Sequence, residues 1–230
     1  MTKFEVLNYE DHRRLRLRLQ HENGPHFVQI IISEFAAAAA SWPILLTKDS
    51  ETGAFFPGIV CGLKAGECML TDVSDQGGYQ PLNALRDGFY ISGERIIIDR
   101  ANHRVSESEG EPLFDSSKQP TANLQQIQHV LGLLHAGADP TNKFVGALAA
   151  LKLIEPIDIS LRFDDGEKLN LQGLYTVSLD ALRELDDAAV VRLFRSGDLQ
   201  LAFAMIGSLK QIEILAYRRN RTLVAPLSGA

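Results

Sequence analysis

The sequence predicts a protein of the α+β class, with a sheet-rich first half and a helix-rich second half. Segments that alternate apolar and polar residues, or are rich in β-branched residues, recur between residues 14 and 107. Apolar residues at helical spacing dominate after residue 120, and one additional strand hairpin lies in that half. We expect a single domain over residues 1–225, with 1–107 and 120–225 as the subdivision if there are two.

Strands are expected throughout the first half. Leu15, Leu17 and Leu19 alternate with arginines, which indicates a half-buried strand with a basic outer face. The polar run Asp49–Gly53 is typical of a hairpin turn between two apolar strands. A second hairpin is expected around residues 101–103. The expected strands cover residues 14–19, 28–32, 44–47, 54–63, 67–73, 94–99 and 104–107.

Helices are expected after a polar, glycine-containing stretch at residues 106–119, which we interpret as a linker or an exposed loop. Pro140 is expected to open a new helix, because proline suits the first helical position. Asp186 is expected to cap a helix that Gly197 ends. The helix after Asp198 is apolar almost all round at its start, so we expect it in a central position. The expected helices cover residues 124–134, 140–153, 179–185, 188–195 and 199–218, with a strand hairpin at 157–177.

Composition and charge limit the partners of the chain. The formal net charge of −6 disfavours binding to nucleic acid or to an anionic membrane surface. The local exception is the basic face of Arg14, Arg16 and Arg18, which could hold an acidic partner or, as edge-strand charges, discourage aggregation. Cys61 and Cys68 are expected to be reduced, partly buried thiols of a cytoplasmic protein.

Residues 27–46 are nearly uncharged and raise the question of a membrane span. Glu34 would cost roughly 2–3 kcal/mol at the middle of a bilayer, the alanines offset little of this, and Pro43 would break a helix. We therefore expect a strand, a short helix and a second strand here, and no membrane span. The first residues reach Glu10 and Asp11 without the apolar run of a signal peptide, which favours a cytoplasmic location.

Known motifs for cofactors, metals and nucleophiles are missing from the sequence. It contains no phosphate-binding glycine loop, nucleophile elbow, zinc-protease helix or calcium loop. His129 and His135 face apart on one expected helix, and His21 and His26 lack further ligands. We therefore expect no cofactor and no metal. An enzyme is unsupported, although a nucleophile and a base need to meet only in space.

Glu34 is the sharpest single candidate for chemistry. A carboxylate between an isoleucine-rich strand and an alanine-rich helix risks desolvation, which would raise its pKa and suit acid–base catalysis. In the structural alternative, Glu34 lies in the first turn of the helix, where the helix dipole favours a negative charge. Trp42 and Tyr79 could form an aromatic binding platform, or Trp42 could pack in the core.

A series of short motifs runs along nearly the whole chain, over residues 10–217. It includes Ser33-Glu34-Phe35, Trp42-Pro43-Ile44, Asp49, Thr52-Gly53, Tyr79, Leu85-Arg86, Glu111-Pro112-Leu113-Phe114, Leu153-Ile154-Glu155-Pro156 and Leu171-Gln172-Gly173-Leu174-Tyr175. Their order and spacing resemble the bacterial SapC family, which is named from surface-array (S-layer) protein loci. The resemblance implies an association with surface-layer protein presentation and type I export, and it transfers no chemistry to particular residues.

The resemblance and the missing catalytic motifs predict a non-enzymatic accessory protein that binds a protein partner in surface-layer protein export or assembly. The expected binding residues are Glu34, Trp42, Asp49, Tyr79 and Arg86, with the two aromatic residues as apolar anchors and the arginine as an ion-pairing contact. The alternative is an enzyme or a small-ligand-binding protein that acts on a modified amino acid or peptide with Glu34 as acid or base. A deep pocket at Glu34 would favour this alternative, and a close-packed interior without water around Glu34 would favour the accessory protein.

Overall fold

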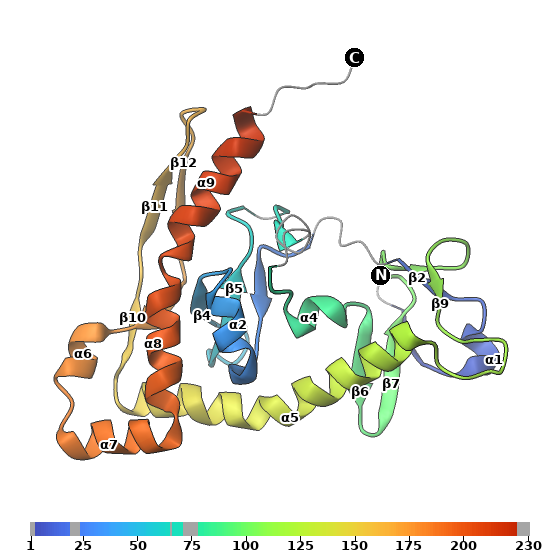
Figure 1. Ribbon diagram of the computed structural model, residues 1–230, viewed down its shortest axis with the longest axis horizontal. Helices are drawn as coiled ribbons and strands as arrows, with labels where there is room; N and C mark the ends of the chain where they lie inside the picture. Colours follow the sequence, from blue (N-terminus) through green and yellow to red (C-terminus); the bar gives the residue numbers. More distant parts are fainter. Residues whose placement is uncertain (1–2, 19–23, 65, 71–77, 225–230) are drawn as a thin grey trace. The chain divides into compact units, whose positions relative to one another are not determined.

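The computed structural model describes residues 3–18, 24–64, 66–70 and 78–224 (Figure 1). Strands predominate in the first half of the chain and helices in the second, which confirms the α+β class. The positions of residues 19 and 71–73, which two of the predicted strands include, lie outside the described residues.

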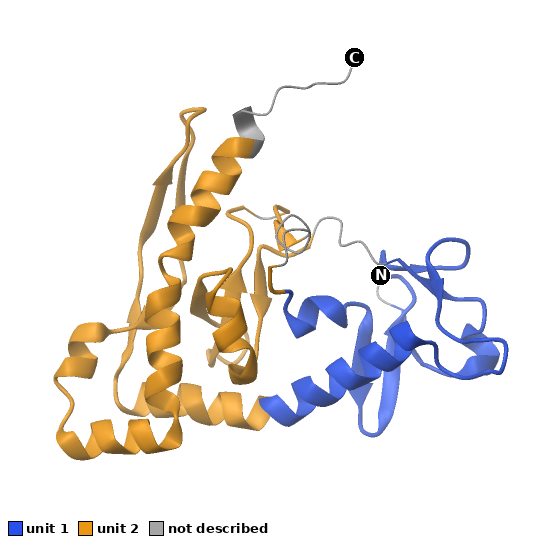
Figure 2. Cartoon of the chain, viewed as in Figure 1, with its two compact units in different colours: residues 1–22, 80–137 blue, residues 23–79, 138–230 orange. Residues whose placement is uncertain are grey.

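The chain divides into two compact units, and each unit is assembled from two separate stretches of sequence (Figure 2). Unit 1 contains residues 1–22 and 80–137, and unit 2 contains residues 23–79 and 138–230. The prediction of one domain over residues 1–225 stays a prediction.

Unit 1 contains two small antiparallel sheets and the first part of a long helix. In one sheet β7 lies between β1 and β6, and in the other β2 lies between β8 and β9. The predicted alternation is confirmed, because Leu15 and Leu17 are buried while Arg16 between them is half-exposed. The elements are β1 (Phe4–Val6), α1 (Tyr9–His12), β2 (Arg16–Leu17), α4 (Leu82–Leu85), β6 (Phe89–Ser92), β7 (Arg95–Asp99), β8 (Val105–Ser106), β9 (Glu111–Pro112) and the start of α5 (Ala122–Ala150).

Two predictions for unit 1 were wrong. The strands at 94–99 and 104–107 do not form a hairpin, because β7 pairs with β1 and β6 whereas β8 pairs with β2. The stretch 106–119 is more than a loop, because it supplies β9 and a fully buried leucine. Gly110 permits this close approach: a Cβ atom there would lie 2.3 Å from the carbonyl oxygen of Leu17. The core of unit 1 consists of Leu15, Leu17, Phe89, Ile98, Leu113, Leu124, Ile127 and Leu131.

Unit 2 is built on a five-stranded antiparallel sheet in the order β10-β13-β4-β5-β3. The predicted hairpin of β4 and β5 is confirmed, with a register from Ile44 opposite Ile59 to Lys48 opposite Phe55. Three successive residues of β4 are fully buried, so this strand is covered on both faces, and α2 and α8 pack against it. The five strands of this sheet are β3 (Phe27–Gln29), β4 (Ile44–Lys48), β5 (Phe55–Val60), β10 (Ile154–Pro156) and β13 (Tyr175–Val177), and β11 (Ile159–Arg162) and β12 (Lys168–Leu171) pair with each other in a separate sheet.

The helices of unit 2 follow the local signals of the sequence. Residues 27–46 form β3, the 3₁₀ helix η1, the short α2 and β4, as predicted. Asp186 caps α7 by accepting a hydrogen bond from the Ala189 amide at 2.6 Å, and Gly197 ends it with a φ of +84°. The helices are η1 (Ile32–Glu34), α2 (Phe35–Ala39), α6 (Leu179–Arg183), α7 (Asp187–Ser196), α8 (Asp198–Ser208), α9 (Gln211–Val224) and the end of α5.

Two helix boundaries differ from the prediction. Pro140 does not open a new helix but lies inside α5, which runs from unit 1 into unit 2. A proline removes one backbone donor from a helix, and the hydrogen bonds on either side still continue it. The helix after Asp198 ends at Ser208, and α9 begins at Gln211. The central position of α8 is confirmed, because it packs against α2, α7, β4 and β13.

One helical stretch of the described residues, Asp198–Arg221, passes a length and composition test for a membrane-spanning helix, with a mean hydropathy of 1.3 over 18 residues. The same test is passed by apolar helices in the core of soluble proteins. Of the residues in that window, 22% are buried in this structure. Some of the other residues are exposed apolar residues of unit 2, which are described below.

Candidate functional site

Three of the five predicted binding residues meet in unit 2. Glu34 ends η1, Trp42 follows α2, and Tyr79 comes from the end of the same stretch of sequence. The Tyr79 hydroxyl donates a hydrogen bond to Oε1 of Glu34, and the Trp42 indole Nε1 donates to the Tyr79 carbonyl oxygen at 2.8 Å. We refer to these residues as the Glu34 cluster.

The Glu34 carboxyl group is enclosed, with 4% of the residue exposed. Its Oε2 accepts a hydrogen bond from the Ile31 backbone amide at 2.8 Å. This is the position from which a glutamate side chain reaches back to the amide that precedes a helix, so it satisfies a donor that the helix leaves unpaired. The carboxyl group thus connects the start of η1 to the Tyr79 hydroxyl, and Glu34 lies in the first turn of η1. The acid–base role of Glu34 stays a prediction.

The two aromatic residues of the Glu34 cluster are held from several sides. Burial, followed by the hydrogen bond to Glu34, raises the pKa of Tyr79, so its hydroxyl remains a donor at neutral pH. Trp42 is fully buried, and the Arg218 guanidinium lies 5.9 Å from the centre of its ring. In the free chain Trp42 is therefore part of the core, and a partner could reach it only if its cover moved.

The other two predicted residues lie elsewhere. Asp49 stabilises the turn between β4 and β5: its Oδ1 accepts from the Thr52 amide and hydroxyl, both at 2.8 Å, and the backbone bond is the main cause that lowers the Asp49 pKa. Arg86 belongs to unit 1, where Nη1 donates to the Phe89 carbonyl at 3.0 Å and the guanidinium stacks 4.7 Å from the Tyr90 ring centre. The role of all five residues in partner binding stays a prediction.

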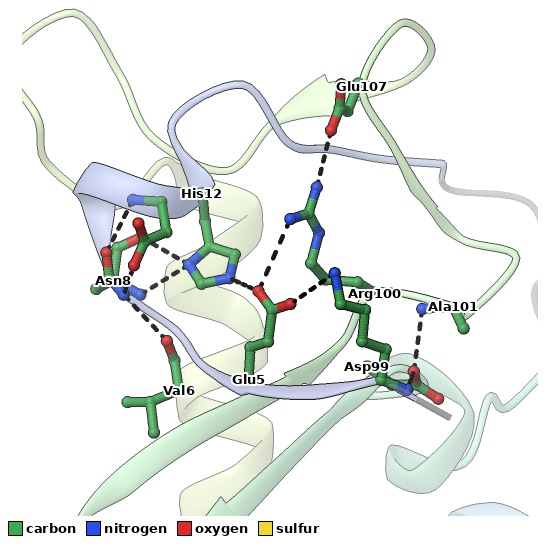
Figure 3. A network of polar contacts seen from close by, with 10 residues as sticks. Glu5, Val6, Asn8, His12, Asp99, Arg100, Ala101 and Glu107 are labelled. Atoms are coloured by element: carbon green, nitrogen blue, oxygen red, sulfur yellow. Dashed lines mark hydrogen bonds and ion pairs between the residues drawn. The ribbon is translucent and has the colours of Figure 1, made fainter. Parts of the chain in front are cut away.

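A polar network in unit 1, absent from the sequence-based candidates, surrounds the buried His12 at the end of α1 (Figure 3). The ring Nε2 lies 3.2 Å from Oε2 of Glu5, and Nδ1 lies 3.0 Å from the Asn8 carbonyl oxygen. Lys3 forms an ion pair with Glu5 at 3.1 Å, and Arg100 approaches it at 3.8 Å. The hydrogen bond from Lys3 is the largest cause that lowers the Glu5 pKa.

This network connects β1, α1 and the end of β7, so its evident effect is structural. His12 and Glu5 supply one nitrogen and one carboxylate, which is fewer ligands than a zinc site requires. Within residues 3–18, 24–64, 66–70 and 78–224, no group of three or more His, Cys, Asp or Glu side chains is arranged to hold a metal ion.

Unit 1 also contains a small cavity of about 170 Å³ beside Arg104. Arg104 is 4% exposed, and its guanidinium donates to the carbonyl oxygens of Leu85 at 2.9 Å and Arg18 at 3.2 Å. Burial lowers the Arg104 pKa. These bonds join the segment before β8 to the end of α4 and to the residue after β2, which no local pattern around Arg104 indicated. The cavity is lined by Leu17, Gln80, Leu85, Arg104, Asn123, Gln126, Ile127 and Val130.

The largest collection of exposed apolar side chains lies on the last three helices. Five of the nine exposed large hydrophobic residues of the described chain fall between residues 191 and 217. We refer to these five as the α7–α9 apolar residues: Val191, Phe194, Phe203, Ile214 and Tyr217.

The α7–α9 apolar residues lie on helix faces opposite the packed ones. On α7, Ala189 and Leu193 are buried at a spacing of four, and Val191 and Phe194 project from the other side. On α8, Phe203 is 51% exposed although its neighbours Ala202 and Met205 are fully buried. The apolar residues on all sides of α8 therefore predicted its central position, but the pattern did not indicate that one face of the helix is exposed.

A family model described as SapC matches residues 7–215. The chain belongs to the SapC family. Comparison with the curated proteins and with the solved structures gave no match. The SapC match includes the whole Glu34 cluster, all of α7 and α8, and α9 as far as residue 215.

Proposed function

We propose that this SapC-family chain is a non-enzymatic accessory protein that binds a protein partner in the export or assembly of a surface-layer protein. The observation that carries the proposal is the exposure of the α7–α9 apolar residues, with Phe194 at 73% and Tyr217 at 63%. Aromatic side chains are enriched at the centres of protein interfaces, where they contribute much of the binding energy.

The charges around these residues indicate what the partner presents. Arg192 and Arg195 are exposed on α7 beside Phe194, and neither forms an ion pair with any residue that the structure describes. A partner surface that has apolar groups bordered by acidic side chains would complement this arrangement. Because exposed charge pairs are screened by salt, binding should weaken, without being lost, as the salt concentration rises.

Affinity capture from an extract of the native cells tests the proposal. The bait is the purified chain, compared with the double variant F194E/F203E and with Leu133→Glu, which places the same charge on an exposed leucine of α5. We expect the wild type and Leu133→Glu to retain a surface-layer or secretion component that F194E/F203E fails to retain. The substituted side chains are exposed, so all three proteins should give the same thermal unfolding temperature.

Two outcomes would overturn the proposal. One is recovery of the same proteins with all three baits, or of no surface-layer or secretion component. The other is an occupant of a different kind: a dimer of this chain in size-exclusion chromatography with light scattering, or flotation with anionic lipid vesicles, each abolished by F194E/F203E. A dimer or a lipid surface would then cover the apolar residues in place of a protein partner.

A further inference from the structure

The two cysteines of unit 2 lie in contact with each other. The Sγ atoms of Cys61 and Cys68 are 3.8 Å apart. Cys61 follows β5 and is fully buried, and its thiol donates a hydrogen bond to the Pro25 carbonyl oxygen at 3.1 Å. Cys68 is partly exposed. Cys68 is therefore the less buried residue of a pair whose sulfur atoms are in contact.

We propose that Cys61 and Cys68 form a redox-modification site, a dithiol that small disulfides such as oxidised glutathione convert into an intramolecular disulfide. A disulfide bond is about 2 Å long, so the two sulfur atoms have to approach each other by roughly 2 Å. Side-chain rotation can supply much of that movement, because the sulfur atoms are already in van der Waals contact.

The backbone holds the dithiol in this arrangement. The Met69 amide donates to the Cys61 carbonyl at 2.8 Å, and the Cys61 amide donates to the His26 carbonyl at 2.9 Å. Between the two cysteines the chain reverses tightly at Gly62, where a Cβ atom would lie 1.9 Å from the carbonyl oxygen of Glu67. Only glycine fits this approach, so the turn brings the second cysteine back beside the first.

The reaction is a pair of thiol–disulfide exchanges. The Cys68 thiolate attacks one sulfur of oxidised glutathione, which forms a mixed disulfide and releases one glutathione thiolate. Cys61 then attacks Sγ of Cys68, forms the Cys61–Cys68 bond, expels the second glutathione and releases its own proton to solvent. The protein dithiol is oxidised by two electrons, and one glutathione disulfide is reduced to two thiols.

The order of the two steps follows from the environments of the thiols. The hydrogen bond with Cys68, and then burial, raise the pKa of the Cys61 thiol, so Cys61 stays protonated at neutral pH. Cys68 is the less buried of the two residues, so we expect an external reagent to react with Cys68 first. Cys61 therefore acts as the resolving cysteine, which reacts once the mixed disulfide lies next to it.

Mass spectrometry of the full chain treated with oxidised glutathione tests this assignment. Trypsin cleaves after Lys64, between the two cysteines, so the disulfide would keep two peptides joined until a reductant is added. We expect the wild type to give the joined peptides with little glutathione adduct. Cys61→Ser should accumulate glutathione on Cys68, and Cys68→Ser should remain unmodified.

Several results would overturn the assignment. They are a wild-type protein that stays reduced, one that accumulates the glutathione adduct, and one that forms disulfides only between two chains. Because Cys61 is fully buried, Cys61→Ala serves as a second variant, and the emission of the buried Trp42 shows whether each variant is folded. If a folded Cys61→Ala chain does not accumulate the adduct, the resolving role of Cys61 is refuted.

Discussion

Replacement of Glu34 distinguishes a structural carboxyl group from a catalytic one. The Glu34 carboxyl accepts hydrogen bonds from the Ile31 amide and from the Tyr79 hydroxyl, in a place where 4% of the residue is exposed. Glu34→Ala removes both acceptors and Glu34→Gln removes one, because an amide offers a single oxygen. Tyr79→Phe removes the hydroxyl from the other side of the same bond.

The expected magnitudes follow from the number of buried donors that lose a partner. A buried polar group without a partner costs about 1–3 kcal/mol. Glu34→Ala should therefore lower the free energy of unfolding by about 2–5 kcal/mol, and Glu34→Gln by about 1–3 kcal/mol. A double-mutant cycle of Glu34→Gln with Tyr79→Phe should show a coupling of about 0.5–3 kcal/mol, because the residues are in direct contact.

Urea denaturation followed by tryptophan emission measures these changes in the free energy of unfolding, with a probe that lies in the Glu34 cluster. Trp42 is the single tryptophan of the chain, it is fully buried, and its indole donates to the Tyr79 carbonyl oxygen. Its emission therefore reports on the Glu34 cluster itself. The matched control is Glu51→Gln on the exposed turn after β4, which should change the free energy of unfolding by less than about 0.5 kcal/mol.

A stabilising role of the Glu34 carboxyl group is excluded if Glu34→Gln unfolds at the same urea concentration as the wild type. Such a result would show that the carboxyl group contributes nothing to the stability of the cluster. The result would favour the alternative in which Glu34 is a catalytic acid or base, because functional residues are commonly retained without any benefit to stability.

Three further predictions concern other parts of unit 2. Ser208→Ala should cost about 1–2 kcal/mol in the same urea titration, because the buried hydroxyl accepts from the Ile44 amide at 2.8 Å; an unchanged midpoint would contradict this. The hydrogen bond from Lys64, and then the one from Arg219, lower the pKa of Glu167. The stabilising contribution of the Glu167 carboxylate is therefore fully present above pH about 4.3 and is lost as the pH falls through the lowered pKa. Thermal unfolding between pH 7 and pH 3 should therefore vary less for Glu167→Gln than for the wild type. A Cys61–Cys68 disulfide, which closes a loop of eight residues, should stabilise the chain by about 2–3 kcal/mol. Oxidation should therefore raise the unfolding temperature, and reduction should reverse the change. An unchanged unfolding temperature after oxidation would contradict the formation of an unstrained disulfide.

The sequence predicted those elements whose signals are local. The alternation of Leu15 and Leu17, the turn between β4 and β5, and the helix limits at Asp186 and Gly197 each depend on neighbouring residues, and the structure confirms them. Strand partners were harder, because pairing depends on segments far apart in sequence. The pairing of β1 with β7, which places Phe4 opposite Asp99, leaves no pattern in either segment alone.

The Glu34 cluster and the dithiol show the same limit at the level of side chains. Glu34 and Tyr79 are 45 positions apart, and only the course of the intervening chain brings the hydroxyl to the carboxyl group. The two cysteines are close in sequence, yet their spacing matches no known motif, and a single glycine at position 62 does not by itself predict the tight reversal that brings them together. The exposure of Phe194 could not be predicted from the sequence either, because a helical pattern shows which residues are apolar but not which face of the helix is covered.

The interleaved make-up of the two units has a consequence for biosynthesis. When the ribosome has completed residue 137, every segment of unit 1 exists, whereas unit 2 has only its first stretch, residues 23–79. That stretch carries β3, β4 and β5 but lacks β10 and β13, so the emerging polypeptide exposes an incomplete sheet until the last third is translated. Fragments cut at a midpoint of the sequence would leave both units unfinished, and ribosome-bound intermediates of this length are where aggregation or chaperone capture should concentrate.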